Sequence, residues 1–157
     1  MPQTIKIING RVITPFRVIP QGSVLISDGR ITAAGEGTIP DHADTIIDAG
    51  GNYVAPGFID LHIHGGGGHD FMDGTVRAFH GITETHARYG TTAMVPTTLT
   101  AEKEHMLHTL DIYKEAVAQP HNGAGFLGMH LEGPYFAMSQ RGAQDPRYIR
   151  NPDPAEY

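Results

Sequence analysis

Cysteine is absent from the 157 residues of this chain. Disulfide bonds, thiolate metal ligands and a cysteine nucleophile are therefore excluded. Histidine is abundant instead, with 10 residues, and together with aspartate and glutamate it supplies the only strong side-chain metal ligands available. Any metal site in this chain must therefore be built from imidazole and carboxylate groups.

Long apolar runs are absent as well. No segment approaches the roughly 18 apolar residues of a membrane-spanning helix, and residues 1–10 lack the apolar core of a secretory signal. Basic residues are few, with 11 Lys and Arg against 17 Asp and Glu and a formal net charge of −6, which argues against a nucleic-acid-binding protein. We expect a cytoplasmic protein that binds neither membranes nor nucleic acids.

Residues 1–54 show short β-strand patterns separated by turns. Asn9-Gly10 and Asp28-Gly29 each lie between two strand-like runs, and both dipeptides favour a hairpin because both turn positions need positive φ. A further short strand is predicted over residues 45–48. Several short strands with turn signals predict a small antiparallel sheet or sandwich, and we assign residues 1–54 to it as a first domain.

From residue 55 onward, strand patterns alternate with helical ones. Buried strands are predicted over residues 58–64, 91–96 and 125–132. The first intervening helix ends at Gly90, and the second is capped by Thr100. The apolar stripes of these helices contain Val76, Phe79, Ile82, His86 and Tyr89 in the first, and Met106, Leu110, Tyr113 and Val117 in the second. Strands that alternate with helices predict βαβ units and a parallel sheet.

The predicted sheet is unfinished. A TIM-type (β/α)₈ barrel takes about 250 residues, whereas roughly 100 follow residue 55 here. The tail over residues 133–157 is polar and loop-like. We therefore predict an α/β chain in which residues 55–157 form the first three strands of an incomplete (β/α)₈ barrel, preceded by part of a small β-sandwich domain. The chain would then be the N-terminal part of a longer protein; the alternative is a small open α/β domain.

Two histidines lie at the end of the first barrel strand. Side chains alternate along a strand, so Asp60, His62 and His64 share a face, and that face would point into the barrel at its C-terminal end, where such barrels carry their active sites. Residues at i and i+2 are about 7 Å apart along a strand, so both imidazoles can converge on one ion. The alternative is a strand that ends in polar residues beside a flexible loop, Gly65–Gly68.

The third predicted strand supplies a carboxylate. By the same alternation, Glu132 points inward at the end of its strand, where a buried carboxylate is costly unless it is paired or binds a metal. His130, two residues deeper, is interpreted as a supporting interior histidine. His62, His64 and Glu132 are therefore our candidate ligands for a divalent ion that acidifies water and polarises a carbonyl group.

Several motifs resemble those of known amidohydrolases. Residues 54–64 (VAPGFIDLHIH) resemble the first-strand signature of the amidohydrolase superfamily. Residues 64–73, residues 130–135 (HLEGPY) and residues 141–144 (RGAQ) resemble, more narrowly, the N-acetylglucosamine-6-phosphate deacetylase family. The resemblance extends over about residues 8–146, and HLEGPY is its most specific part.

This resemblance implies hydrolysis of the N-acetyl group of N-acetylglucosamine 6-phosphate, which gives glucosamine 6-phosphate and acetate, by a homodimeric full-length protein. It implies that Glu132 is a metal ligand and that Ala143 and Gln144 contact the sugar. His62 and His64 match members that hold a second metal, so one or two ions, zinc or iron, are expected.

The family's remaining metal histidines and its proton-relay aspartate come from later strands, beyond Tyr157. We therefore expect no catalytic residue within this chain and no activity from the chain alone. Two alternatives stay open. One is an amidohydrolase that acts on a cyclic amide or an N-acyl amino acid, and the other is a non-catalytic metal-binding module.

Overall fold

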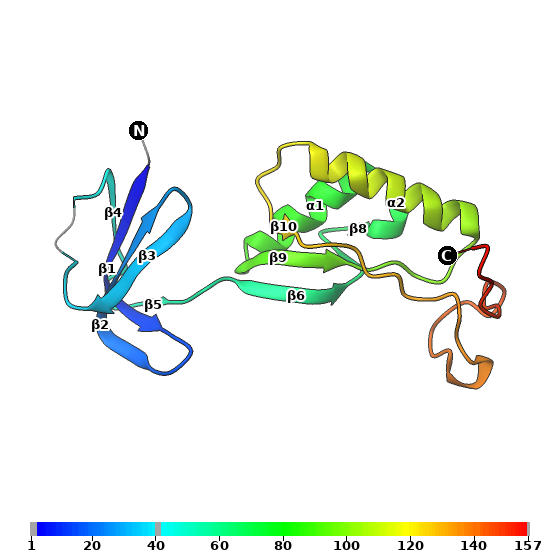
Figure 1. Ribbon diagram of the computed structural model, residues 1–157, viewed down its shortest axis with the longest axis horizontal. Coiled ribbons are helices and arrows are strands. Elements are labelled where there is room, and N and C mark those ends of the chain that lie inside the picture. Colours follow the sequence, from blue (N-terminus) through cyan, green and yellow to red (C-terminus); the bar gives the residue numbers. More distant parts are fainter. Residues whose placement is uncertain (1–2, 40–41, 157) are drawn as a thin grey trace. The chain divides into compact units, whose positions relative to one another are not determined.

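A computed structural model describes residues 3–39 and 42–156 (Figure 1). The chain forms two compact units, Met1–Pro56 and Gly57–Tyr157, and each is considered by itself. In the part of the chain that the structure describes, no helix combines the length and the apolar character needed to cross a membrane.

The first unit is a mixed five-stranded sheet with the order β3-β2-β1-β4, in which β5 also pairs with β1. Its strands are β1 (Thr4–Ile13), β2 (Val18–Ser27), β3 (Arg30–Glu36), β4 (Thr45–Asp48) and β5 (Tyr53–Val54). The expected antiparallel pairing holds for β1 with β2 and for β2 with β3, whereas β4 and β5 run parallel to β1. The prediction of a short strand at residues 45–48 is confirmed.

One of the two predicted hairpins forms. Asp28 and Gly29 have φ values of 51° and 72° and connect β2 to β3 directly, as an Asp-Gly turn with two positive φ angles should. Asn9 also has a positive φ, of 55°, but β1 continues through it and the register with β2 shifts there. The hairpin predicted at Asn9-Gly10 is wrong: the extra residue forms an irregularity of the bulge type.

The second unit contains a parallel sheet with the order β10-β9-β6. Its main elements are β6 (Phe58–Ile63), α1 (Val76–Ala87), β9 (Thr91–Pro96), α2 (Lys103–Ala118) and β10 (Gly125–Phe126). Between β6 and α1 lie the two-residue strands β7 (Gly65–Gly66) and β8 (His69–Asp70) and the 3₁₀ helix η1 (Phe71–Asp73); a second 3₁₀ helix, η2 (Met138–Gln140), lies in the tail. Both long helices lie on one side of the sheet (Figure 1).

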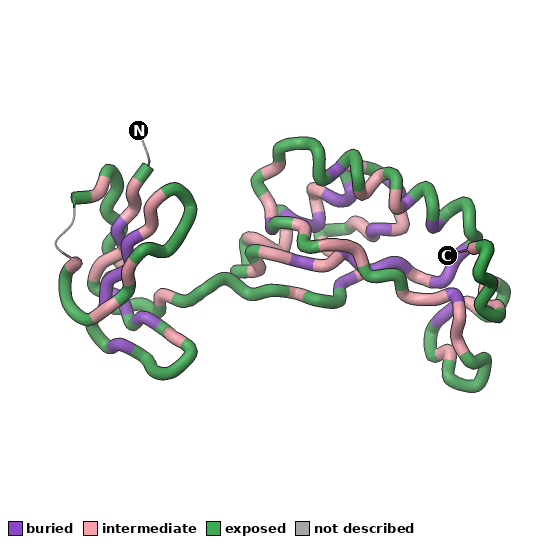
Figure 2. Tube along the Cα trace, in the orientation of Figure 1, coloured by how far each residue is buried: buried purple, intermediate pink, exposed green. Residues whose placement is uncertain are grey.

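The core of this unit lies between the helices and the sheet. Its buried members are Ile63, Phe71, Phe79, Ile82, Met94, Ala116 and Ala124. Figure 2 shows β6 mostly exposed up to its end. Ile59 and Leu61, on the face of β6 opposite to Asp60 and His62, are 60% and 66% exposed. β6 is an edge strand, and its register with β9 shifts twice.

Two further expectations about this unit need correction. The strand predicted over residues 125–132 is regular only in β10, although the pairing resumes where His130 bridges to Thr97. Thr100 does not cap α2: Glu102 occupies the N-cap position and makes no side-chain cap bond. The backbone N–H of Thr100 is bonded instead to Gln144, in the polar tail.

Candidate metal centre

The end of β6 is locked to the end of β9 between the two candidate histidines. The backbone N–H of Ile63 donates to the hydroxyl oxygen of Thr97 over 3.1 Å, and the N–H of Thr97 donates to the carbonyl oxygen of Ile63 over 2.8 Å. Ile63 is buried in the core, so its neighbours His62 and His64 must point to the opposite face. Two reciprocal hydrogen bonds thus fix the backbone from which both imidazoles project.

Thr98, the residue after Thr97, holds Glu132 close to the two histidines. The backbone N–H of Glu132 donates to the hydroxyl oxygen of Thr98 over 3.0 Å, and the N–H of Thr98 donates to the carbonyl oxygen of His130 over 3.0 Å. The threonines that follow β9 therefore anchor both halves of the site.

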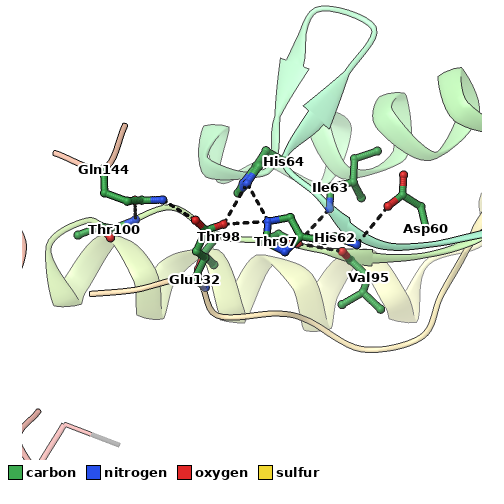
Figure 3. Close-up of polar contacts among 10 residues, drawn as sticks. All are labelled: Asp60, His62, Ile63, His64, Val95, Thr97, Thr98, Thr100, Glu132 and Gln144. Atoms are coloured by element: carbon green, nitrogen blue, oxygen red, sulfur yellow. Dashed lines mark hydrogen bonds and ion pairs between the residues drawn. The ribbon is translucent and has the colours of Figure 1, made fainter. Parts of the chain in front are cut away.

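The three candidate ligands converge, as Figure 3 shows. Oε2 of Glu132 lies 2.9 Å from Nε2 of His62 and 3.1 Å from Nε2 of His64, and these two nitrogens are 3.3 Å apart. The side chains are 50% exposed for His62, 34% for His64 and 23% for Glu132. Among the described residues, this group is the one cluster of three or more such side chains with metal-binding spacing.

The geometry of this triad fits a divalent ion. Ligand atoms about 2.0–2.1 Å from a tetrahedral ion lie about 3.3 Å from one another, close to the three distances observed. Oε2 of Glu132 is buried and, despite its short distances to both imidazoles, has no partner with hydrogen-bond geometry. A carboxylate oxygen aimed between two imidazole nitrogens rather than along an N–H bond is the arrangement that a shared cation would satisfy.

His130 lies beside the triad rather than within it. The centroids of the His130 and His62 rings are 4.9 Å apart, with the planes inclined by 59°. The residue is exposed, which differs from the interior position predicted for it. Its ring packs on that of a candidate ligand and so restricts the rotation of His62.

Ala143 and Gln144, the predicted sugar contacts, lie in the loop after η2. Ala143 is exposed, whereas Gln144 is buried and is bonded through its side chain to Glu132. The guanidinium of Arg147 bonds the carboxylate of Asp145 and holds the pKa of Asp145 below its usual range, so the residue after Gln144 is firmly anionic. Contact of Ala143 and Gln144 with a sugar stays a prediction.

The four glycines after His64 form a tight hairpin that packs on α1. Gly67 and Gly68 have φ values of 63° and 83° and turn β7 into β8. A methyl group on Gly66 would overlap the imidazole of His86, whose Nε2 lies 3.1 Å from the carbonyl oxygen of Gly65. The glycines therefore let the chain that leaves His64 approach a helix closely.

Three helical histidines contact this same segment. His105 Nε2 lies 2.8 Å from the carbonyl oxygen of Met72, and His108 Nε2 lies 3.2 Å from that of Gly74. With His86, they tie the stretch between His64 and α1 to both helices. No periodicity rule predicts that a helical histidine will bond to the carbonyl oxygen of a loop residue.

Known proteins resemble this chain in sequence and in structure. Residues 45–121 match the model of a family described as "Amidohydrolase family". The N-acetylglucosamine-6-phosphate deacetylase of Bacillus subtilis is 33% identical over 157 residues, which cover 98% of this chain and 40% of that protein. The chain is therefore similar to amidohydrolases.

Solved structures of deacetylases are also similar to this chain. N-acetylglucosamine-6-phosphate deacetylase from Pasteurella multocida matches 97% of the chain with a TM-score of 0.87 and 30% identity. A variant of the Mycobacterium smegmatis enzyme, solved in complex with N-acetyl-D-glucosamine-6-phosphate, matches 99% with a TM-score of 0.79 and 29% identity. The chain spans about two fifths of the length of these relatives, 40% and 39% respectively.

Proposed function

We propose that the protein containing this chain removes the N-acetyl group from N-acetylglucosamine 6-phosphate and releases glucosamine 6-phosphate and acetate. The observation that carries this proposal is the convergence of His62, His64 and Glu132 within 3.3 Å of one another. Its support from similarity is that the relatives described above bear the name of this deacetylase.

The proposal assigns the three side chains to a divalent metal site. A metal ion bound there would lower the pKa of water and polarise the acetamide carbonyl. Glu132 contributes the negative charge that offsets part of the ion's charge, and the imidazoles contribute neutral nitrogen donors. The half-exposed ring of His62 leaves the site open on the side from which a substrate can approach. Imidazole and carboxylate ligands suit both zinc and iron, and the site can belong to a centre of one or two ions. The identity and the number of the bound ions are therefore to be measured.

The proposal extends to the architecture. Residues 55–157 would form the first three βα units of a (β/α)₈ barrel, and residues 1–54 part of a small β-sandwich. The parallel order β10-β9-β6 and the helices on one side of it support this. The site then lies where barrel enzymes carry their chemistry, because His62 and Glu132 lie at the carboxyl ends of parallel strands. A homodimer is part of the same proposal.

The experiment uses the longest natural protein that contains this sequence, called here the parent protein. Acetate release from N-acetylglucosamine 6-phosphate is measured before and after removal of metal with a chelator and after its return. We expect turnover that disappears with the metal and reappears with it. The same assay is run with unphosphorylated N-acetylglucosamine and with N-acetylgalactosamine 6-phosphate, which isolate the contributions of the phosphate and of the sugar hydroxyl configuration.

The outcomes separate the candidate functions. Turnover of a cyclic amide or an N-acyl amino acid in place of the amino-sugar phosphate would replace the proposed substrate. Stoichiometric metal binding with no hydrolysis of any of these compounds would indicate a non-catalytic metal-binding module. Residues 1–157 alone are expected to release no acetate; measurable turnover by that purified chain would contradict the requirement for residues beyond Tyr157.

A further inference from the structure

The side chain of Gln144 is buried beside the metal centre, with 8% of the residue exposed. Its Nε2 group donates to Oε1 of Glu132 over 2.7 Å, and its Oε1 accepts from the backbone N–H of Thr100 over 2.9 Å. A backbone N–H can only donate and an ionised carboxylate can only accept, so these neighbours fix which end of the amide faces which. Figure 3 shows the chain of bonds from Thr100 through Gln144 to Glu132.

The bond from Gln144 gives the two carboxylate oxygens of Glu132 different partners. Oε1 is taken by the amide of Gln144, while Oε2 faces the imidazoles of His62 and His64. Rotation of the carboxylate about its last bond, away from the observed orientation, would break a short, charge-assisted hydrogen bond in a buried place. The amide therefore holds one oxygen, and only one, toward the two histidines.

We propose that Gln144 is a positioning residue for the metal ligand Glu132, which it fixes as a one-oxygen donor with the backbone of Thr100 as its anchor. This inference rests on the proposed metal site. Ligating carboxylates are generally held by such outer hydrogen bonds, and the loss of one typically weakens metal binding about 10- to 100-fold.

The backbone around Glu132 is also held in place by specific contacts. Its N–H donates to Thr98 Oγ1, and the next residue, Gly133, has a φ of 84° and so close an approach to the Thr100 hydroxyl that a methyl group there would overlap it. With the main chain fixed on both sides, the freedom left to Glu132 is that of its side-chain torsions. The bond from Gln144 to Oε1 restricts these torsions.

The loop that carries Gln144 is itself anchored. The backbone N–H of Gln144 donates to the carbonyl oxygen of Arg141 over 3.1 Å. The following residue, Asp145, accepts from Arg147 Nη2 over 2.6 Å and from Arg147 Nε over 3.0 Å. Because these bonds order the loop, the amide of Gln144 can hold the carboxylate of Glu132 in position. On a mobile loop, the amide would move with the carboxylate.

A positioning role and a sugar contact make different demands on Gln144. A sugar contact contributes to substrate affinity and leaves the metal unaffected. A positioning role acts on the metal first, whether or not substrate is present. Metal binding in the absence of substrate therefore separates the two.

The test uses the parent protein with Gln144→Met, which keeps the length of the side chain and removes both hydrogen bonds. A second variant, Gln144→Glu, keeps an acceptor for Thr100 and removes the donor to Glu132. Gln140→Met is the matched control, because Gln140 lies exposed on η2. Each protein is stripped and reloaded with Co²⁺; the dissociation constant is measured by competition with a chelator, and the visible absorption band reports the ligand geometry.

We expect about 10- to 100-fold weaker cobalt binding and a changed absorption band in both Gln144 variants, and no change in Gln140→Met. Unchanged cobalt affinity and spectrum in Gln144→Glu, with KM alone raised, would overturn the positioning role in favour of a sugar contact. If Gln144→Met does not fold, Gln144→Glu decides. If the unsubstituted parent protein binds no cobalt, the proposed function itself fails, which is a separate result.

Discussion

Nε2 of His64 lies 3.1 Å from Oε2 of Glu132, although His64 follows β6 and Glu132 follows β10, the two edges of the sheet order β10-β9-β6. The strand between them supplies the connection. Thr97 pairs with Ile63 next to His64, and Thr98 accepts from the backbone of Glu132. The site is therefore a property of three strand ends held in register, and its precision depends on two threonine hydroxyls that are not candidate ligands.

The first prediction concerns the ligands. Glu132→Gln removes the negative charge that faces both imidazoles, and His62→Ala combined with His64→Ala removes both nitrogen donors. We expect each change to abolish stoichiometric metal binding at this site in the parent protein, as measured by elemental analysis after dialysis. Glu115→Gln, on the exposed side of α2, and His42→Ala, in a loop of the first unit, are the matched controls. Unchanged metal content in both site variants would refute the assignment.

The second prediction concerns the glycine hairpin. Gly66→Ala places a methyl group against the imidazole of His86, and the bond from that imidazole to the carbonyl of Gly65 must lengthen or break. Overpacking of this kind costs about 1–3 kcal/mol of stability. Gly35→Ala is the control, because nothing lies within 4 Å of the added carbon there. Equal denaturant midpoints for the two variants would show that the hairpin does not need its close approach to α1.

The local pattern of the sequence predicted β6, β9, the two long helices and the convergence of the three candidate ligands. The alternation of side chains along residues 58–64 places His62 and His64 on one face. The parallel βαβ order places Glu132 beside them. Both rules use only short stretches of sequence, and together they predict the site. The same rules failed at Asn9, where a turn dipeptide lies inside a strand whose two halves pair with the same partner, β2.

The contacts that brace the site were beyond those rules. The bond from Gln144 to Glu132 depends on how an irregular loop folds back, and the bonds from His105 and His108 depend on where η1 lies relative to α2. No periodicity encodes either arrangement. Thr100 is an example. Threonine is a residue type that often caps a helix, yet the backbone N–H of Thr100 donates to the side chain of Gln144 in the tail.

The third prediction concerns the core beneath the site. Phe79 is fully buried, with its ring 4.8 Å from that of Phe71 and 6.1 Å from that of Phe126 between ring centroids. Phe79→Ala removes a large buried side chain and is expected to cost about 3–5 kcal/mol of unfolding free energy. Phe16→Ala, at a position 95% exposed, should change it by less than about 0.5 kcal/mol. Chemical denaturation of the parent protein, followed by circular dichroism, measures both.

The fourth prediction concerns the pH response of His121. Burial lowers the pKa of His121 below its ordinary value of 6.5, the nearby His80 lowers it further, and Glu84 raises it in opposition. The rings of His121 and His80 are stacked with their centroids 4.9 Å apart. The backbone N–H of Gly123 donates to Nδ1 of His121 over 3.3 Å. The folded state therefore favours the neutral imidazole.

The direction of the stability change follows from this. Between the lowered pKa of the folded state and 6.5, the unfolded chain binds more protons at His121 than the folded chain does. The contribution to stability is thus fully present above pH 6.5 and is lost as the pH falls below it. Titration of the His121 ring proton by NMR should give a pKa below 6.5. His80→Gln, which keeps a donor for the carbonyl of Ala116 and removes the neighbouring imidazole, should move that pKa upward. A pKa for His121 at or above 6.5 in the unsubstituted protein would contradict the burial of its ring against His80 and Phe126.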